Sequence, residues 1–231
     1  MIIPERMSVY INSLDTGNDT FLDELERTAI ADHVPVIRPD MQSFLKVLLA
    51  IHRPHRILEV GTAIGFSALL MAANTDSDCQ ITTIENYEKR IPLARENFRR
   101  AAMEERITLI PGDAQEILPT LKDPFDFIFM DAAKGQYIHF LPEVLRLLRV
   151  GGVLVSDNVL QDGDIMESHY AVEQRNRTIY KRMREYLYVL KHTDGLLTSI
   201  VAVGDGAAVT VKQAEVPVEY LSKMRERGSV S

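Results

Sequence analysis

The chain has 231 residues, of which 46% are hydrophobic and 26% charged, as is ordinary for a globular protein with a sizeable core. Its formal net charge of -7 argues against a protein that coats nucleic acid through overall positive charge, although a local basic patch is not excluded. The single cysteine, Cys79, excludes an internal disulfide and a metal site built from several cysteines.

The N-terminal part of the chain is predicted to be helical. Its first residues contain no apolar segment followed by a small-residue cleavage site, and no apolar run approaches the roughly 18 residues that a membrane helix needs. Together with the cysteine content, this leads us to expect a cytoplasmic protein. Apolar residues recur at helical spacing and predict three helices, at residues 4–15, 20–33 and 40–52.

Strands and helices then alternate. Short apolar strands are predicted at residues 56–60, 81–85, 107–110, 125–130 and 152–156. The intervening segments are predicted to be helices, at residues 65–73, 87–102, 114–121 and 137–148. This alternation predicts βαβ units and a parallel sheet covered on both faces.

The C-terminal part has a different pattern. One long helix is predicted over residues 166–190, followed by strands at 196–203 and 207–212. The short Gly-Asp-Gly turn between these strands, residues 204–206, predicts an antiparallel hairpin added at one edge of the sheet.

No change of composition marks a domain boundary. We therefore expect a single α/β domain over residues 1–231. Its parts would be N-terminal helices at 1–52, a catalytic core at 53–212 and a charged tail at 213–231.

A glycine-containing turn links the first strand to the next helix. Gly61 and Gly65 would let the backbone turn sharply and approach a ligand, and the helix that follows offers free N–H groups. The glycine spacing fits neither the dinucleotide fingerprint nor a P-loop. A plain turn between strand and helix explains this pattern equally well.

Acidic residues near the ends of successive strands favour a ligand site. Glu85 ends the second strand about twenty residues on, where a carboxylate can accept both ribose hydroxyls. Asp113 and Ala114 follow the third strand, although Asp113 alone would more often be a helix cap. Glu59 lies inside a strand that should be buried, so its carboxylate needs partners, with backbone amides or a cofactor ammonium group as candidates.

Two further strands end in oxygen-bearing side chains. Asp131 follows the fourth strand, and Asp157 with Asn158 follows the fifth, on the carboxyl edge where open α/β sheets bind ligands. These oxygens suit octahedral Mg²⁺, although each Asp taken alone is more often a cap. Lys134 should reach the same place and could act as a base, or it could be an ordinary solvated lysine.

Taken together, these motifs resemble the cation-dependent O-methyltransferases, the class of catechol and caffeoyl-coenzyme A O-methyltransferases. The resemblance is carried by the segments 58–67, 112–114, 130–134 and 156–158, with Glu85. It implies a Rossmann-like S-adenosylmethionine-dependent methyltransferase fold, with a mostly parallel seven-stranded sheet, a C-terminal antiparallel hairpin and extra N-terminal helices.

The resemblance also implies a role for each motif residue. The methionine part of the cofactor would be surrounded by Glu59, Gly61, Thr62, Gly65 and Ser67, with Ile37 covering it. Glu85 would bind the ribose, and Asp113 with Ala114 would flank the adenine. Asp131, Asp157 and Asn158 would hold the metal, Asp131 would also face the cofactor, and Lys134 would be the catalytic base.

The substrate is predicted from the surface and from the resemblance. A helix face carries the cations Arg175, Arg177, Lys181, Arg182 and Arg184, and could bind phosphates or be a solvated face with internal pairs. Arg99 and Arg100 could extend it. Similarity to bacterial tRNA 5-hydroxyuridine methyltransferases favours the tRNA wobble uridine, which would become 5-methoxyuridine.

Two alternatives to this reading stay open. A catechol-like small molecule is the second substrate class, and a cofactor-binding module without enzymatic activity is the third reading. The N-terminal helices and the edge hairpin offer surfaces for a homodimer.

Overall fold

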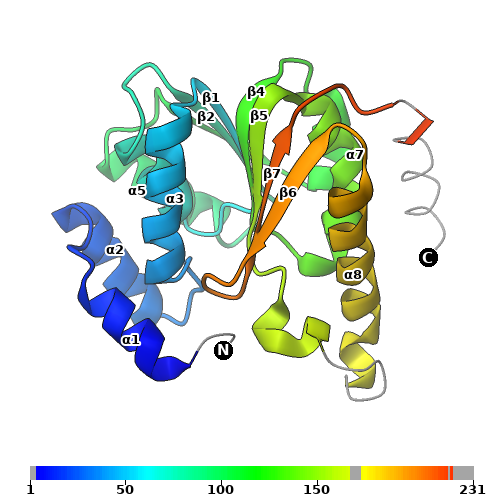
Figure 1. Cartoon of the computed structure of the whole chain (residues 1–231). Coiled ribbons are helices and arrows are strands. Elements are labelled where there is room, and N and C mark those ends of the chain that lie inside the picture. The colour runs from blue at the N-terminus through cyan, green and yellow to red at the C-terminus, as the bar shows by residue number, and fades with distance from the viewer. Residues whose placement is uncertain (1–3, 167–172, 218, 221–231) are drawn as a thin grey trace. The chain divides into compact units, whose positions relative to one another are not determined.

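The computed structural model describes residues 4–166, 173–217, 219 and 220 (Figure 1). The chain forms two compact units that meet in sequence after Asp113. We call Ile3–Asp113 the N-terminal unit and Ala114–Ser231 the C-terminal unit. No helix of the described residues has both the length and the apolarity that a membrane span requires.

Three helices open the N-terminal unit: α1 (Glu5–Ser13), α2 (Thr20–Ala31) and α3 (Pro39–His52). The α2 helix begins where the Asp19 side chain accepts a hydrogen bond from the Leu22 amide at 2.9 Å. Proline fits the first position of α3, since that position needs no intrahelical N–H bond. All three helices agree with the prediction, with ends that differ by one or two residues.

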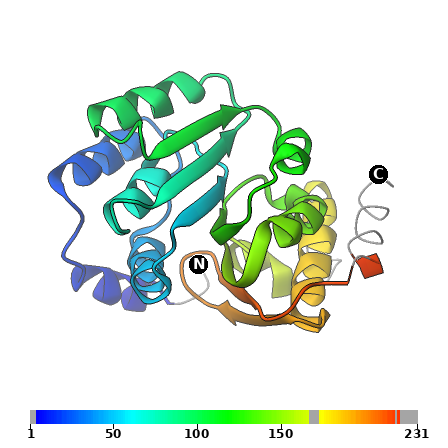
Figure 2. The same ribbon diagram turned by 90° about the horizontal axis from the view of Figure 1, so that it is seen from above.

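Parallel strands form the rest of this unit. The order is β3 (Ile107–Pro111), β2 (Gln80–Glu85), β1 (Arg56–Val60), and Figure 2 shows the three side by side. The connecting helices are α4 (Phe66–Ala73) and α5 (Ile91–Arg100). Every residue of α4 from Phe66 to Ala72 is buried, as expected for a helix that is apolar on all sides.

The C-terminal unit contains the other strands, in the order β4-β5-β7-β6. The parallel pair is β4 (Phe125–Met130) and β5 (Leu148–Ser156), and every residue of β4 is buried. The hairpin strands are β6 (Leu196–Val201) and β7 (Ala207–Lys212). β7 pairs antiparallel with both β5 and β6, so the predicted hairpin is confirmed.

The segments between and beside these strands form α-helices and short 3-10 helices. The α-helices are α6 (Ala114–Ile117), α7 (Tyr137–Leu147) and α8 (Arg177–His192). The short 3-10 helices are η1 (Leu118–Thr120), η2 (Lys134–Gln136), η3 (Gln161–Met166) and η4 (Gln174–Asn176).

The prediction of one helix over residues 166–190 is wrong at its N-terminal end. Met166 ends a 3-10 helix, Glu173 is not helical, and Gln174–Asn176 form another 3-10 turn before α8 begins at Arg177. Residues 167–172 of the predicted helix, and most of the predicted tail, lie outside the described residues. Glu173 pairs with Arg175 at 2.6 Å, a local contact that apolar periodicity does not register.

A buried lysine fixes the end of α7. The Lys212 ammonium donates to the carbonyls of Leu145 at 3.0 Å and Leu148 at 2.9 Å, and to Glu215 at 2.7 Å. A cation there satisfies carbonyls that the end of a helix leaves without a donor. Strand β7 is thereby joined to α7 as well as to its two neighbouring strands.

Candidate active site

The N-terminal unit places a buried hydroxyl network behind the β1–α4 turn. Glu59 has no exposed surface, and its carboxylate accepts hydrogen bonds from Ser67, at 2.5 Å, and from Thr83. The Thr83 hydroxyl also lies 2.5 Å from that of Thr62. The pairing of β1 with β2 brings Glu59 opposite Thr83. Side-chain hydroxyls are therefore among the partners of the Glu59 carboxylate. The backbone amides and the cofactor ammonium group that the sequence suggests stay predictions.

Gly61 and Gly65 both adopt the left-handed conformation, with φ of 100° and 86°. At Gly65 a second constraint acts, because a methyl group there would overlap the ring of Phe98 from α5. The requirement for glycine at 65 thus comes from packing as well as from the sharpness of the turn. Phe98 lies too far along the chain for this contact to be read from the turn motif.

Glu85 ties this turn to the end of β2. One carboxylate oxygen accepts from the Ala63 amide at 2.7 Å, and the other accepts from the Tyr87 amide at 2.8 Å. Both oxygens keep a free lone-pair direction, because a carboxylate oxygen can accept two hydrogen bonds. The carboxylate is therefore held rigidly and can still accept hydroxyl groups.

The remaining cofactor residues occupy different environments. Asp113 is exposed directly after β3, and Ala114 is buried at the start of α6. Ile37 is buried, and its carbonyl accepts from the Gln42 side chain at 2.9 Å. The roles of Ile37, Asp113 and Ala114 toward a cofactor stay predictions.

The C-terminal unit brings together the predicted metal ligands. Asp157 is 4% exposed, and its Oδ1 accepts from the Asn158 amide at 2.7 Å. The Asn158 side chain donates to Asp131 Oδ1 at 3.1 Å. Asn158 has φ of 60°, a left-handed conformation that asparagine tolerates better than most residues. The two strand ends therefore place three oxygen-bearing side chains in one cluster.

Burial and mutual repulsion decide the charge of the two carboxyls. Burial raises the pKa of Asp131 to about 6, while Asn158 and Lys134 oppose this shift. Burial, the negative charge of Asp131 and that of Asp205 raise the pKa of Asp157 to about 8. The positive charge of Lys134 lowers the pKa of both carboxyls. Its role as a base stays a prediction.

This donor set fits a hard divalent cation. Two carboxylates that repel each other in a buried place gain from a cation between them. An asparagine amide can present its oxygen to such an ion after half a turn about its last side-chain bond. No group of three or more His, Cys, Asp or Glu side chains suited to a metal occurs among the described residues, and this site needs none, since Asn158 would supply the third ligand.

Two residues of this centre had no assigned role in the sequence. Asp205, in the β6–β7 turn, is buried and acts on Asp157, and its backbone carbonyl accepts from the Leu160 amide at 2.9 Å. Tyr137 is fully buried beside both strand ends. The sequence marked Asp205 only as part of the Gly-Asp-Gly turn, and it gave Tyr137 no signal, because apolar periodicity cannot separate a functional buried tyrosine from a core residue.

The chain is similar to known O-methyltransferases. Residues 12–213 match the family model described as O-methyltransferase. A catechol O-methyltransferase of Mycobacterium tuberculosis is 32% identical over 71% of this chain and 76% of its own. A caffeoyl-CoA O-methyltransferase of Populus kitakamiensis is 31% identical over 76% of both.

A solved structure supports the fold. The SAH-bound methyltransferase PaMTH1 of Podospora anserina aligns with a TM-score of 0.81 and 26% identity, over 93% of this chain and 99% of its own. This likeness confirms the Rossmann-like α/β fold with a mostly parallel sheet and a C-terminal antiparallel hairpin. The chain belongs to the O-methyltransferase family, together with the catechol and caffeoyl-CoA O-methyltransferases that it resembles.

Proposed function

We propose that the chain is a cytoplasmic enzyme that transfers the methyl group of S-adenosylmethionine to a hydroxyl of a small catechol-like substrate held by Mg²⁺. The observation that carries the proposal is the cluster of buried Asp157 with half-buried Asp131 and Asn158, in which the charge of Lys134 acts on the two carboxyls. A cofactor-binding module without activity would have no use for such a cluster.

The N-terminal unit supports the cofactor part of the proposal. Glu85 is held by two backbone amides with acceptor capacity left for ribose hydroxyls. Glu59 would orient Ser67 and, through Thr83, Thr62 around the methionine part, next to Gly61 and Gly65. Asp113 with Ala114 would flank the adenine, Ile37 would cover the methionine part, and Asp131 would face the cofactor. An O-methyltransferase of Bacillus cereus, 26% identical, was solved in complex with SAH.

The C-terminal unit supports the chemistry. A bound divalent cation lowers the pKa of a coordinated hydroxyl and stabilises its anion, worth several kcal/mol of barrier. Asp131, Asp157 and Asn158 would hold that cation. Lys134, in its neutral amine form, would take the proton of the hydroxyl and become an ammonium group, whose charge would be balanced by the two carboxylates on whose pKa values it acts.

A substrate with two adjacent oxygens would suit this site, because both oxygens can bind one metal. Catechols have this arrangement, and so does 5-hydroxyuridine with its neighbouring 4-carbonyl. The relatives named above are a catechol and a caffeoyl-CoA methyltransferase. This favours the small phenol over the tRNA that the sequence favoured.

The structure of the expected phosphate-binding face supports tRNA binding less than its sequence of cationic residues does. Arg175 pairs with Glu173, Arg182 donates to the Gly135 carbonyl at 3.2 Å, and Arg184 donates to the Ile165 carbonyl at 3.2 Å. In the other unit, Arg99 pairs with Glu96 at 2.6 Å, and Arg100 lies over the Phe21 ring. Internal partners thus account for several cations that a phosphate backbone would need.

The test is methyl transfer from labelled S-adenosylmethionine to a catechol and, separately, to tRNA from a strain that lacks the wobble modification. We expect labelled catechol with Mg²⁺ and none with a chelator. The Asp157→Asn variant should lose at least 100-fold in activity, whereas Asp194→Asn, at an exposed turn residue, should not. If methoxyuridine in tRNA were the only product, tRNA would replace the phenol as the proposed substrate. Undiminished methyl transfer in the presence of chelator would refute the role of the metal.

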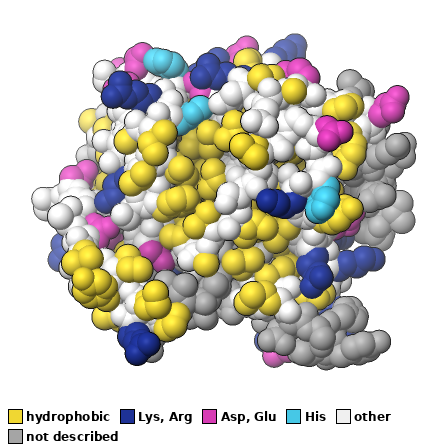
Figure 3. Space-filling view, viewed as in Figure 1, with side chains coloured by type: hydrophobic (Ala, Val, Ile, Leu, Met, Phe, Trp, Pro, Cys, Tyr) yellow, Lys and Arg dark blue, Asp and Glu magenta, His cyan; other side chains and the backbone are white. Residues whose placement is uncertain are grey.

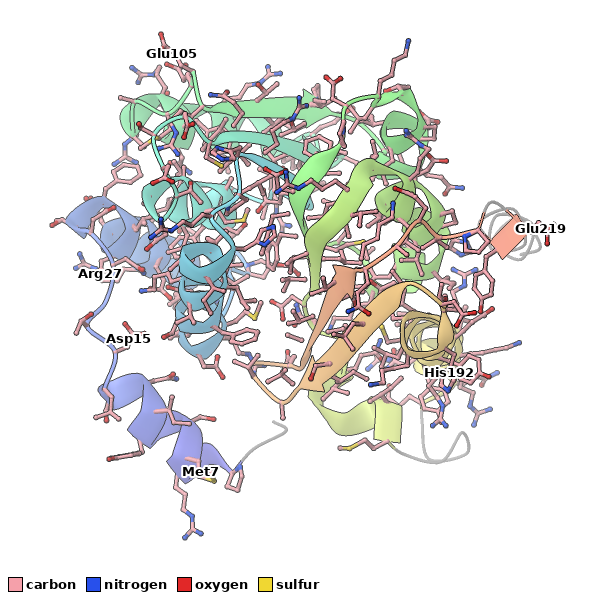
Figure 4. All side chains as sticks on the ribbon, turned by 45° about the horizontal axis from the view of Figure 1, so that its top comes forward. Met7, Asp15, Arg27, Glu105, His192 and Glu219 are labelled. Carbon is pink, nitrogen blue, oxygen red and sulfur yellow. The ribbon has the colours of Figure 1, made fainter. Side chains whose placement is uncertain are left out.

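We propose that the enzyme assembles as a homodimer. Four apolar side chains at helical spacing are exposed on α1 and at Leu14, the residue that caps its C-terminal end: Met7 (48%), Tyr10 (65%), Ile11 (46%) and Leu14 (65%). Figure 3 shows hydrophobic side chains gathered over α1, and in Figure 4 Met7 points away from the helix. A second copy could cover such a patch through a self-complementary contact.

A further inference from the structure

Tyr137 lies where the two carboxylate-bearing strands end. It is the first residue of α7 and has no exposed surface. Its hydroxyl is 3.0 Å from the carbonyl oxygen of Met130 and 3.0 Å from that of Asp157. Met130 directly precedes Asp131. One side chain therefore bridges the backbone at both carboxylates.

The backbone around this hydroxyl explains what it supplies. The Met130 carbonyl also accepts from the Asp157 amide at 2.9 Å, which ties the chain after β5 to the end of β4. The pairing of β5 with β4 and with β7 ends at Ser156, one residue earlier. The Asp157 carbonyl thus lies beyond the ladder, and the Tyr137 hydroxyl is a donor to it. A buried carbonyl that loses its donor is destabilising.

Core packing accounts for the ring of Tyr137 and leaves its hydroxyl unexplained. The ring meets that of Tyr186 edge-on, with centroids 5.5 Å apart and planes at 72°. A phenylalanine would fill the same space. The hydroxyl must be explained by its backbone contacts, which lie at Met130, Ala132 and Asp157. These contacts flank Asp131 and include Asp157, and the charges of these two carboxylates repel each other.

We propose that Tyr137 is a positioning residue whose hydroxyl fixes the separation of Asp131 and Asp157 and thereby sets the affinity of the site for its divalent cation. This inference rests on the proposed function, because it takes the two carboxylates to be metal ligands. Tyr137 does not touch the cation or the substrate in this account. It acts through the backbone.

The chain offers a matched control in Tyr186. This tyrosine is equally buried, and its hydroxyl lies 2.5 Å from the Ser156 hydroxyl, a side-chain contact that does not involve the backbone of either carboxylate. Replacement by phenylalanine removes the same atom from both sites. Only at 137 should the ligand positions change.

The test is direct titration of wild type, Tyr137→Phe and Tyr186→Phe with Mn²⁺, followed by electron paramagnetic resonance. Thermal unfolding without metal and S-adenosylmethionine binding are measured alongside. We expect Tyr137→Phe to raise the Mn²⁺ Kd roughly fivefold or more, as one lost bond to a buried carbonyl implies. The Mn²⁺ Kd of Tyr186→Phe should stay within about twofold of the wild-type value. The two variants should lose a similar amount of thermal stability. Both variants should bind the cofactor like wild type, and saturating metal should restore most of the kcat of Tyr137→Phe.

Each other outcome has a defined meaning. A wild-type chain that binds no Mn²⁺ refutes the metal site, and the inference with it. Wild-type binding with an unchanged Kd for Tyr137→Phe, or with equal losses in both variants, refutes the inference alone. Should Tyr137→Phe not fold, para-aminophenylalanine at 137 keeps a weaker donor in place, and it must raise the Kd above that of tyrosine.

Discussion

The two carboxyls that follow β4 and β5, Asp131 and Asp157, favour different protonation states with and without a bound cation. In the folded chain, burial raises the pKa of Asp131 to about 6. Burial and the negative charge of Asp131 raise the pKa of Asp157 to about 8. The folded chain without metal therefore binds protons that the unfolded chain releases near pH 4. A metal removes this difference, because it holds both groups ionised.

We predict that the metal-free protein loses stability as the pH rises. A group with a raised folded-state pKa stabilises the fold at low pH, and this contribution is lost between about pH 4 and the folded pKa near 8. With a chelator, the Tm should fall by roughly 5 °C or more from pH 6 to pH 8.5, and Mg²⁺ should cancel much of that fall. Asp157→Asn, which has no proton to lose at this position, should show a smaller fall. A Tm that is independent of pH in wild type with chelator would contradict this.

At the scale of single elements, α8 supports the loop that carries Lys134. Arg182 of α8 donates to the carbonyl of Gly135, the residue after Lys134, at 3.2 Å. The arginine thus holds the short helix η2 in place. It does so from α8, whose cationic residues suggested a tRNA-binding surface in the sequence.

We predict that Arg182→Ala lowers kcat roughly five- to tenfold for a catechol substrate, because Lys134 would be held less precisely. The Kd for metal should change little, since neither carboxylate touches Arg182 in the described contacts. Lys122→Ala, which removes an exposed cation of the same unit, serves as the control. Steady-state kinetics with a full metal titration measures both quantities, and an unchanged kcat would refute this role.

The sequence predicted the elements better than it predicted their contacts. Periodicity and glycine turns located the strands, and strand ends located Asp131, Asp157 and Asn158, because these signals are local. Two contacts could not be predicted in this way. A side chain at 65 would overlap Phe98, which is distant in sequence. The contacts of the Tyr137 hydroxyl depend on how deeply this side chain is buried. The start of α8 was missed because apolar spacing continues where hydrogen bonding changes to 3-10 geometry.

At the scale of the whole molecule, we predict a homodimer whose interface includes α1. We expect the wild-type chain to have the mass of a dimer in light scattering, and the Tyr10→Glu, Leu14→Glu double variant to have the mass of a monomer. Charges placed in an apolar contact cost several kcal/mol when buried without partners. Val150→Glu, at a residue 46% exposed in β5, should leave the dimer intact. A double variant that remains dimeric would exclude α1 from the interface.

The position of β7 affects how this protein matures on the ribosome. β7 enters the sheet between β5 and β6, although it is the last strand to be synthesised. Ser156, next to the proposed metal ligand Asp157, pairs with Ala208, about 50 residues later, which is roughly 3–10 s of translation. During that interval the edge of β5 keeps open hydrogen-bonding groups that another nascent chain could pair with. Completion of the catalytic centre and protection from aggregation therefore depend on the same late event.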